Sequence, residues 1–232
     1  MLDARHRLII ALDVSSAAAA RTIVAAVGES ALIYKIGMQL YTAEGPHLVR
    51  ELVASGREVF LDLKYHDIPN TVAAAVREAS ALGVHMLTIH AAGGGKMMRA
   101  AVEAAASRPE LKILAVTVLT SLGDSDLEIT GVRGQVVDQV LRLGALALAA
   151  RCHGLVASAH EASALRAELH GDFVIVTPGV RPAGAGHGDQ VRVVTPREAI
   201  ESGATHIVVG RPITEAPDPA AEARAILGEI SF

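Results

Sequence analysis

Cysteine and aromatic residues are scarce in this chain. Cys152 is the only cysteine, so an intramolecular disulfide is impossible and the sequence is typical of a protein from a reducing compartment. Tryptophan is absent, and three phenylalanines and three tyrosines offer little surface on which nucleic-acid bases could stack. The formal net charge of −4 also provides no general attraction for nucleic acid or for anionic membranes.

Long apolar runs and the common metal and nucleotide motifs are missing as well. With no stretch of about twenty apolar residues and no amino-terminal signal, we expect a cytoplasmic protein with no membrane partner. The ten histidines form no HxxxH pair and no compact His/Cys set, so no metal site is predicted. HAAGGGK lacks the GxxxxGK[ST] spacing of a phosphate loop, and a helix start explains it better.

What the sequence does contain is a repeated alternation of short apolar runs and Ala-rich amphipathic segments. Eight runs are expected to be strands, at 7–14, 31–38, 57–65, 85–91, 111–120, 154–159, 172–180 and 205–213. The segments between them, such as TVAAAVREASALG and RGQVVDQVLRLGALALAAR, favour helix. This pattern predicts an α/β fold, a single-domain (β/α)8 TIM barrel over residues 1–232, although periodicity alone also allows an open doubly wound sheet.

Unusual polar residues gather where the predicted strands end. In a (β/α)8 barrel the active site lies at this rim, because the loops that follow the strands meet there. The residues concerned are Asp13, Lys35, Asp62, Lys64, Thr120, Arg181, Gln190, Gly210 and Arg211. Two further segments, GDSDLEIT and RPAGAGHGDQ, are predicted to be loops on the same functional face.

The stretch FLDLKYHDIPNT places charges inside a strand that is otherwise apolar. Asp62 and Lys64 alternate with leucines, so both charged side chains should point to one face. A single buried charge is very costly, but opposite charges about 4 Å apart interact by roughly 4 kcal/mol at an effective dielectric near 20. One interpretation is a structural ion-pair network. The other is a preorganised site in which Lys64 donates a proton and the aspartates fix charge near a reacting carbon.

DLKYHDIPNT closely resembles the DxKxxDxxxT signature of the orotidine 5′-phosphate decarboxylase family. The segments ALDV, YKIG, TVLTS, TPGVRP, GDQ and VVGRPI also resemble this family, in its order and over nearly the whole chain. DxKxxD alone is shared by a wider suprafamily that includes sugar-phosphate decarboxylases and aldolases. The resemblance implies conversion of orotidine 5′-phosphate to uridine 5′-phosphate and CO2, the final step of UMP biosynthesis, without a cofactor.

The resemblance also implies roles for the charged residues. Asp13 would contact the ribose, and Lys35 would bridge the ribose and the charged array. Asp62 would lie beside the substrate carboxylate, and Lys64 would deliver a proton to C6 as CO2 leaves. Asp67 and Thr71 would complete the active site of a neighbouring subunit, which makes a homodimer part of the mechanism.

Further substrate-binding positions follow from the same resemblance. Thr120 and Ser121 match the segment that meets the pyrimidine, and Ile68 is another expected contact. The expected phosphate site comprises Arg181, Pro182, Gln190, Gly210 and Arg211. Its place after strands seven and eight is a frequent phosphate site in barrels, although a solvated surface loop with incidental arginines is the simpler alternative.

The sequence also allows two other functions. One is a Mg²⁺-dependent sugar-phosphate lyase of the wider suprafamily, in which Thr120, Ser121 and the GDQ segment would have no evident purpose. The other is a catalytically silent protein that binds a phosphorylated ligand. Such a protein would need Arg181 and Arg211 but not the complete array of aspartates and lysines.

Overall fold

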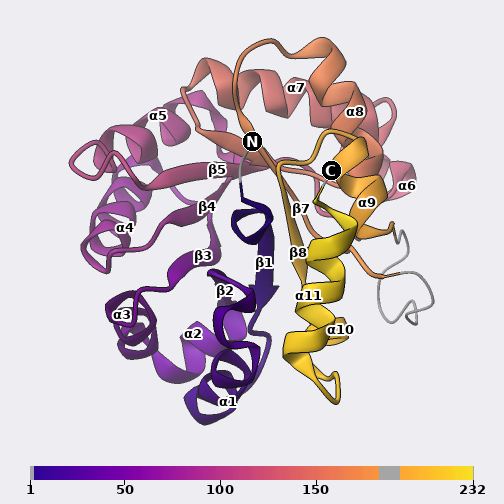
Figure 1. Cartoon of the computed structure of the whole chain (residues 1–232). Helices are drawn as coiled ribbons and strands as arrows, with labels where there is room; N and C mark the ends of the chain where they lie inside the picture. The colour runs from indigo at the N-terminus through magenta and orange to yellow at the C-terminus, as the bar shows by residue number, and fades with distance from the viewer. Residues whose placement is uncertain (1–2, 183–193, 232) are drawn as a thin grey trace.

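The computed structural model describes residues 3–182 and 194–231 and has a closed barrel of eight parallel strands at its centre (Figure 1). Each strand pairs with the next along the chain, and β8 pairs with β1 through Leu8↔Ile207, Ile9↔Val208 and Ile10↔Val209. The predicted (β/α)8 barrel is therefore confirmed. The open doubly wound sheet is excluded, because an open sheet has two edge strands, whereas here each of the eight strands pairs with a neighbour on both sides.

The strands are shorter than the sequence pattern predicts. They are β1 Leu8–Ala11, β2 Ile33–Gly37, β3 Glu58–Tyr65, β4 Met86–His90, β5 Lys112–Val116, β6 Gly154–Val156, β7 Val174–Thr177 and β8 His206–Val209. The predictions that Asp13 ends strand one and that Thr120 closes strand five were wrong, since both residues follow their strands. Runs of β-branched residues favour extended backbone whether or not a neighbouring strand is within reach.

Strands seven and eight end early for a clearer local reason. Pro178 follows Thr177 directly, and proline has no N–H to donate to a neighbouring strand. After Val209 the chain turns at Gly210 into a short helix that begins at Arg211, with Pro212 in its first turn. Arg211 was predicted within strand eight but lies at the amino-terminal end of this helix.

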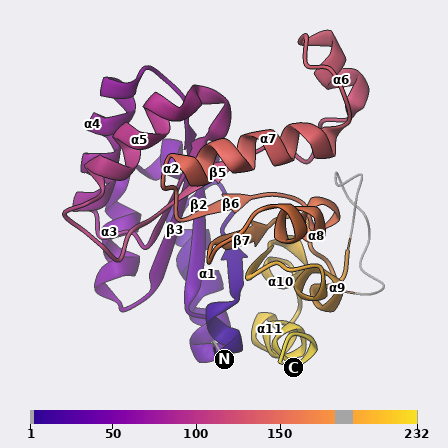
Figure 2. The same cartoon turned by 90° about the horizontal axis from the view of Figure 1, so that it is seen from above.

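Helices surround the barrel and link successive strands (Figures 1 and 2). The α-helices are α1 Ala17–Val27, α2 Met38–Glu44, α3 Pro46–Ala54, α4 Pro69–Ala81, α5 Gly94–Ala104, α6 Asp124–Ile129, α7 Val136–Ala149, α8 Ala159–Glu168, α9 Pro196–Glu201, α10 Arg211–Thr214 and α11 Pro219–Glu229. Short 3-10 turns cover η1 Ala4–His6, η2 Gly28–Ser30 and η3 Ala91–Gly93. Within the part of the chain described, no helix is long and apolar enough to cross a membrane.

Local sequence signals set several of these helices. Ser16 caps α1 by accepting a hydrogen bond from the backbone N–H of Ala19, and Asp218 caps α11 in the same way. GGGK starts α5, as predicted. GDSDLEIT, expected to be a loop, instead forms α6, because the Asp126 carboxylate accepts the backbone N–H of Gly123 and so stabilises the first turn.

The strands bury both of their faces, which explains their nearly continuous apolar sequences. The inner layer fills the barrel and comprises Ile9, Ala11, Ile33, Phe60, Met86, Leu114, Val176 and Val208. A larger layer packs between the strands and the surrounding helices. Lys35, Asp62 and Thr88 each lie two residues after an inner-layer residue, so they face the barrel axis above that core.

Candidate active site

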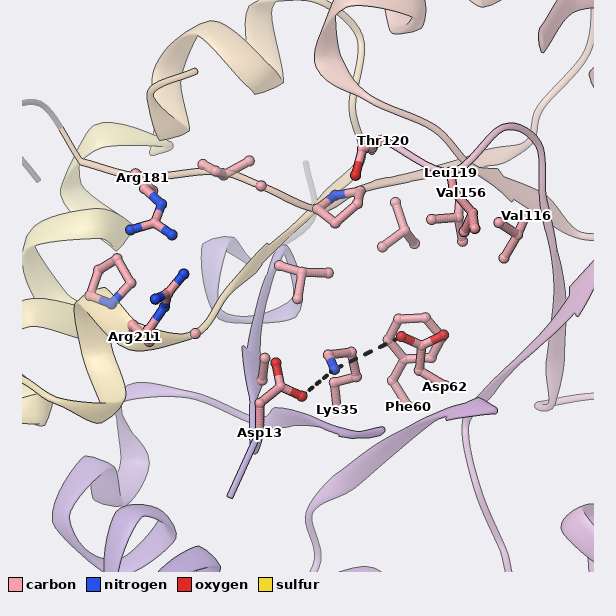
Figure 3. Close-up of a pocket in the computed structure, with 18 of the residues that line it drawn as sticks. Asp13, Lys35, Phe60, Asp62, Val116, Leu119, Thr120, Val156, Arg181 and Arg211 are labelled. Carbon is pink, nitrogen blue, oxygen red and sulfur yellow. Dashed lines mark hydrogen bonds and ion pairs between the residues drawn. The ribbon is translucent and has the colours of Figure 1, made fainter. Parts of the chain in front are cut away.

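A cavity of about 580 Å³ opens at the carboxyl ends of the strands (Figure 3). Its charged lining consists of Asp13, Lys35, Asp62, Lys64, Arg181, Arg211 and Glu215. Its apolar lining includes Ala11, Val14, Phe60, Val116, Val118, Leu119, Val156, Ala157, Val176, Val180 and Val208. This cavity lies where active sites of (β/α)8 barrels are found.

Four charges of alternating sign form a connected row in the cavity. The Lys35 Nζ donates to Asp13 Oδ1 at 2.7 Å and lies 3.8 Å from Asp62 Oδ2. On the other side of Asp62, the Lys64 Nζ lies 2.9 Å from each carboxylate oxygen. The side chains of Lys35, Asp62 and Lys64 are 11%, 14% and 24% exposed, so each charge depends on its neighbours for compensation.

The predicted proximity of Asp62 and Lys64 is confirmed, but regular strand alternation does not produce it. Lys64 has a φ of 51°, in the left-handed region, and the register between β3 and β4 shifts between Leu61 and Tyr65. The Lys64 N–H donates to Thr88 Oγ1 at 2.9 Å. A local distortion of β3 therefore accompanies the contact between the Lys64 ammonium and Asp62.

Thr88 and the apolar wall of the cavity were missed by the sequence reasoning. Thr88 Oγ1 also donates to Asp62 Oδ1 at 2.9 Å, and its side chain is fully buried. The only signal for it was a hydroxyl residue at an inward position of β4. Phe60, Val116 and Val156 give the cavity an apolar wall near Asp62 (Figure 3), and in sequence they are indistinguishable from core residues.

Two arginines lie on the other side of the cavity from Asp62. Figure 3 shows the guanidinium groups of Arg181 and Arg211 pointing toward one another into the cavity. Arg181 follows β7 and is 9% exposed. Its backbone N–H donates to the Val194 carbonyl at 3.0 Å. Two guanidinium groups directed into one space can hold an anion in a forked arrangement.

Of the remaining predicted site residues, some line the cavity and others do not. Thr120 and Gly210 line the cavity, whereas Ser121 is exposed beside it and Pro182 does not belong to the lining. Gln190 lies outside the described residues.

A separate group comprises Asp67 and Ile68, between β3 and α4, and Thr71 in the first turn of α4. All three are exposed, Ile68 to 67%, and none lines the cavity of its own chain.

Two histidines, His66 and His90, lie close together near the rim of the barrel. Burial, followed by the nearby His66 and Lys64, lowers the pKa of His90, so this ring is uncharged at neutral pH. The His90 ring lies 5.4 Å from that of His66, centroid to centroid. Across the residues that the structure describes, no three His, Cys, Asp or Glu side chains are grouped so as to hold a metal ion.

Gly37 gives a first test of how tightly the charged row is packed. A Cβ on Gly37 would lie 3.1 Å from the Lys35 Nζ and 3.3 Å from Asp13 Oδ1, and its φ of −91° is accessible to alanine. Gly37→Ala should therefore fold normally but displace Lys35, lowering kcat/KM for the substrate proposed below by about tenfold. Gly228→Ala on α11, where a Cβ meets nothing within 4 Å, is the matched control. Unchanged kcat/KM in Gly37→Ala would contradict a tightly packed row.

The closed barrel, with a charged cavity at the carboxyl ends of its strands, defines a (β/α)8-barrel protein with an enzyme-like site. The model of the orotidine 5'-phosphate decarboxylase / HUMPS family matches residues 6–226, and the chain belongs to this family.

Several proteins named orotidine 5'-phosphate decarboxylase are similar to this chain over nearly their full length. An orotidine 5'-phosphate decarboxylase of Anaeromyxobacter dehalogenans is 52% identical over 221 residues, covering 95% of this chain and 96% of that protein. One of Moorella thermoacetica is 50% identical over 238 residues, covering 100% of this chain and 94% of that protein. The crystal structure of the Lactobacillus acidophilus protein of that name, 36% identical, has a TM-score of 0.86 and covers 97% of this chain and 99% of its own.

Proposed function

We propose that this protein converts orotidine 5′-phosphate to uridine 5′-phosphate and CO2, the last step of UMP biosynthesis. The observation that carries the proposal is the row Asp13–Lys35–Asp62–Lys64 in the barrel mouth. Family membership and the names of relatives about 50% identical support the same substrate. A purely structural ion-pair network would not require a cavity beside it with two arginines on the other side.

Lys64 is the proposed proton donor. When the bond between C6 and the carboxylate breaks, CO2 leaves and the electron pair stays on C6, where the pyrimidine ring delocalises it poorly. The Lys64 ammonium stabilises this charge and transfers its proton to C6, and the neutral amine then regains a proton from water. A cation already held in place at 2.9 Å from Asp62 needs little reorganisation during the reaction.

The other members of the row position the substrate. Asp62 lies beside the substrate carboxylate in the proposed complex, while Asp13 and Lys35 bind the ribose. The pyrimidine meets Thr120 and Ser121 next to the apolar wall. This wall excludes water from the reacting carbon, and in a dry site the charge of Lys64 acts more strongly.

The phosphate is the proposed ligand of the two arginines. Arg181 and Arg211 bind its oxygens, and Pro182, Gln190 and the backbone at Gly210 complete the site. The arginines lie apart from Asp62 in the cavity, which matches a nucleotide whose phosphate is remote from its reacting ring.

The proposed active unit is a homodimer. Asp67, Ile68 and Thr71 are exposed and lie outside their own cavity, so a second copy of the chain could receive them. In this arrangement Asp67 and Thr71 complete the partner's active site. The exposed Ile68 would be covered by the contact, which favours association.

The direct test is the loss of orotidine 5′-phosphate absorbance after purified, EDTA-treated protein is added. We expect complete turnover with no added metal or cofactor. Turnover that stops with chelator and returns with Mg²⁺ would instead favour a sugar-phosphate lyase type of chemistry. Binding of orotidine 5′-phosphate without turnover would instead indicate a catalytically silent protein that binds a phosphorylated ligand.

Arg211→Ala tests whether phosphate binding contributes to the chemical step. We expect KM to rise and kcat to fall, each by about tenfold or more, because binding energy from the phosphate is used to hold the ring in its reactive position. Arg224→Ala, an exposed arginine on α11, is the matched control. Addition of a phosphate analogue to a truncated nucleoside substrate should restore part of the wild-type rate. A higher KM with unchanged kcat would show that the phosphate serves only for attachment.

The proposed location is the cytoplasm. Cys152 is the single cysteine, it is buried, and burial raises the pKa of its thiol to about 12. A protonated thiol of this kind is unreactive and fits a packing role in a reducing compartment.

A further inference from the structure

The backbone of Lys64 adopts a conformation that its residue type disfavours. A φ of 51° is uncommon for a residue with a side chain, and among the described residues only Lys64 and Arg151 have positive φ without being glycine. Such a conformation persists only where the surrounding structure holds it. The shift in register between β3 and β4 occurs at the same place, between Leu61 and Tyr65.

The side chain of Thr88 contacts this distorted segment twice. Its Oγ1 accepts the backbone N–H of Lys64 at 2.9 Å, and Lys64 has no paired residue in the registers that β3 forms with β2 and β4. The same hydroxyl donates to Asp62 Oδ1 at 2.9 Å. Thr88 is fully buried and does not line the cavity, so it acts from behind the row of charges.

We propose that Thr88 is a positioning residue that locks Lys64 and Asp62 in their mutual geometry. One hydroxyl fixes the backbone of the proton donor and the carboxylate that orients its ammonium. The three groups form a closed loop of hydrogen bonds, since the Lys64 Nζ returns to Asp62 at 2.9 Å. This inference rests on the proposed role of Lys64 as the proton donor.

The hydroxyl can be removed almost without change of shape. Thr88→Val keeps the β-branched side chain but leaves the Lys64 N–H and Asp62 Oδ1 without this partner, whereas Thr88→Ser keeps the hydroxyl. Thr177 provides a matched control on β7, because it is fully buried and its hydroxyl has no hydrogen-bond partner among the residues described. Thr177→Val therefore measures how activity changes when a buried threonine hydroxyl without a hydrogen-bond partner among the described residues is removed.

We expect Thr88→Val to lower kcat for orotidine 5′-phosphate by about 10- to 100-fold while KM changes by less than about threefold. Thr88→Ser and Thr177→Val should each stay within about threefold of wild type in both constants. Thr88→Ala, which also lacks the hydroxyl, replaces the valine variant in this comparison if thermal melting shows that Thr88→Val is unfolded. A kcat for the hydroxyl-free variant within about threefold of wild type would overturn the proposal. So would an equal loss in Thr88→Ser, which would show that side-chain shape is what counts.

A second measurement does not depend on turnover. Hydrogen exchange of the Lys64 amide, followed by NMR, should accelerate by about tenfold or more in Thr88→Val but not in Thr88→Ser or Thr177→Val. Unchanged exchange in Thr88→Val would refute the lock on the backbone. If wild-type protein failed to decarboxylate orotidine 5′-phosphate, the proposed function would fail. The exchange experiment would still report whether Thr88 holds Lys64.

Discussion

Lys64→Ala is expected to lose nearly all turnover, with kcat reduced by about 1,000-fold or more, because general acid catalysis by a positioned group is commonly worth about 100- to 10,000-fold. The fold should survive, since Asp62 still accepts a hydrogen bond from Thr88 and its Oδ2 still lies 3.8 Å from the Lys35 Nζ. Phosphate binding should also persist, because Arg181 and Arg211 lie apart from Asp62 in the cavity. The measurement is single-turnover decarboxylation together with thermal unfolding.

Lys112→Ala is the control for this experiment, because Lys112 begins β5 at the opposite end of the barrel and does not line the cavity. It should retain wild-type turnover. Activity of Lys64→Ala within about tenfold of wild type, a barrier change of about 1.4 kcal/mol, would exclude Lys64 as the proton donor. A large loss of stability with activity preserved in the folded fraction would favour the structural ion-pair interpretation.

Mixing two inactive variants is expected to restore activity if Asp67 serves the partner's site. Lys64→Ala and Asp67→Asn proteins, each nearly inactive, are unfolded together and allowed to reassociate. In a mixed dimer, one site receives both defects, and the other combines an intact Lys64 with an intact Asp67. Random equal pairing makes about half of the dimers mixed, so about one quarter of all sites should regain wild-type activity.

The same mixing experiment can also contradict a shared active site. If Asp67 acted within its own chain, every site in the mixture would retain one defect and no activity would return. Mass spectrometry establishes that mixed dimers have formed, so a lack of rescue in their presence would refute the shared site. Refolding each variant alone supplies the background rate that recovery must exceed.

The sequence by itself determined where the eight strands lie along the chain and which polar residues are candidates for the chemistry. Alternating apolar runs and Ala-rich segments predicted the eight strand–helix units, because these preferences depend on residues close together in the chain. The motif DLKYHDIPNT pointed to Asp62 and Lys64, and both line the cavity. Strand ends were less predictable, since β propensity continues past Val116 into Thr117 and Val118 although pairing in β5 stops at Val116.

Only the tertiary structure decided how these parts meet. Closure of the barrel brings β8 against β1. The pairing of β1 with β2 places Asp13 at 2.7 Å from Lys35, although the two residues are 22 positions apart. Thr88 lies 24 positions from Lys64, yet its hydroxyl contacts the distorted backbone there. The register of neighbouring strands sets such distances, and register depends on packing throughout the barrel. Because local patterns carry no information about that packing, the geometry of the charged row and of Thr88 behind it appeared only in the folded chain.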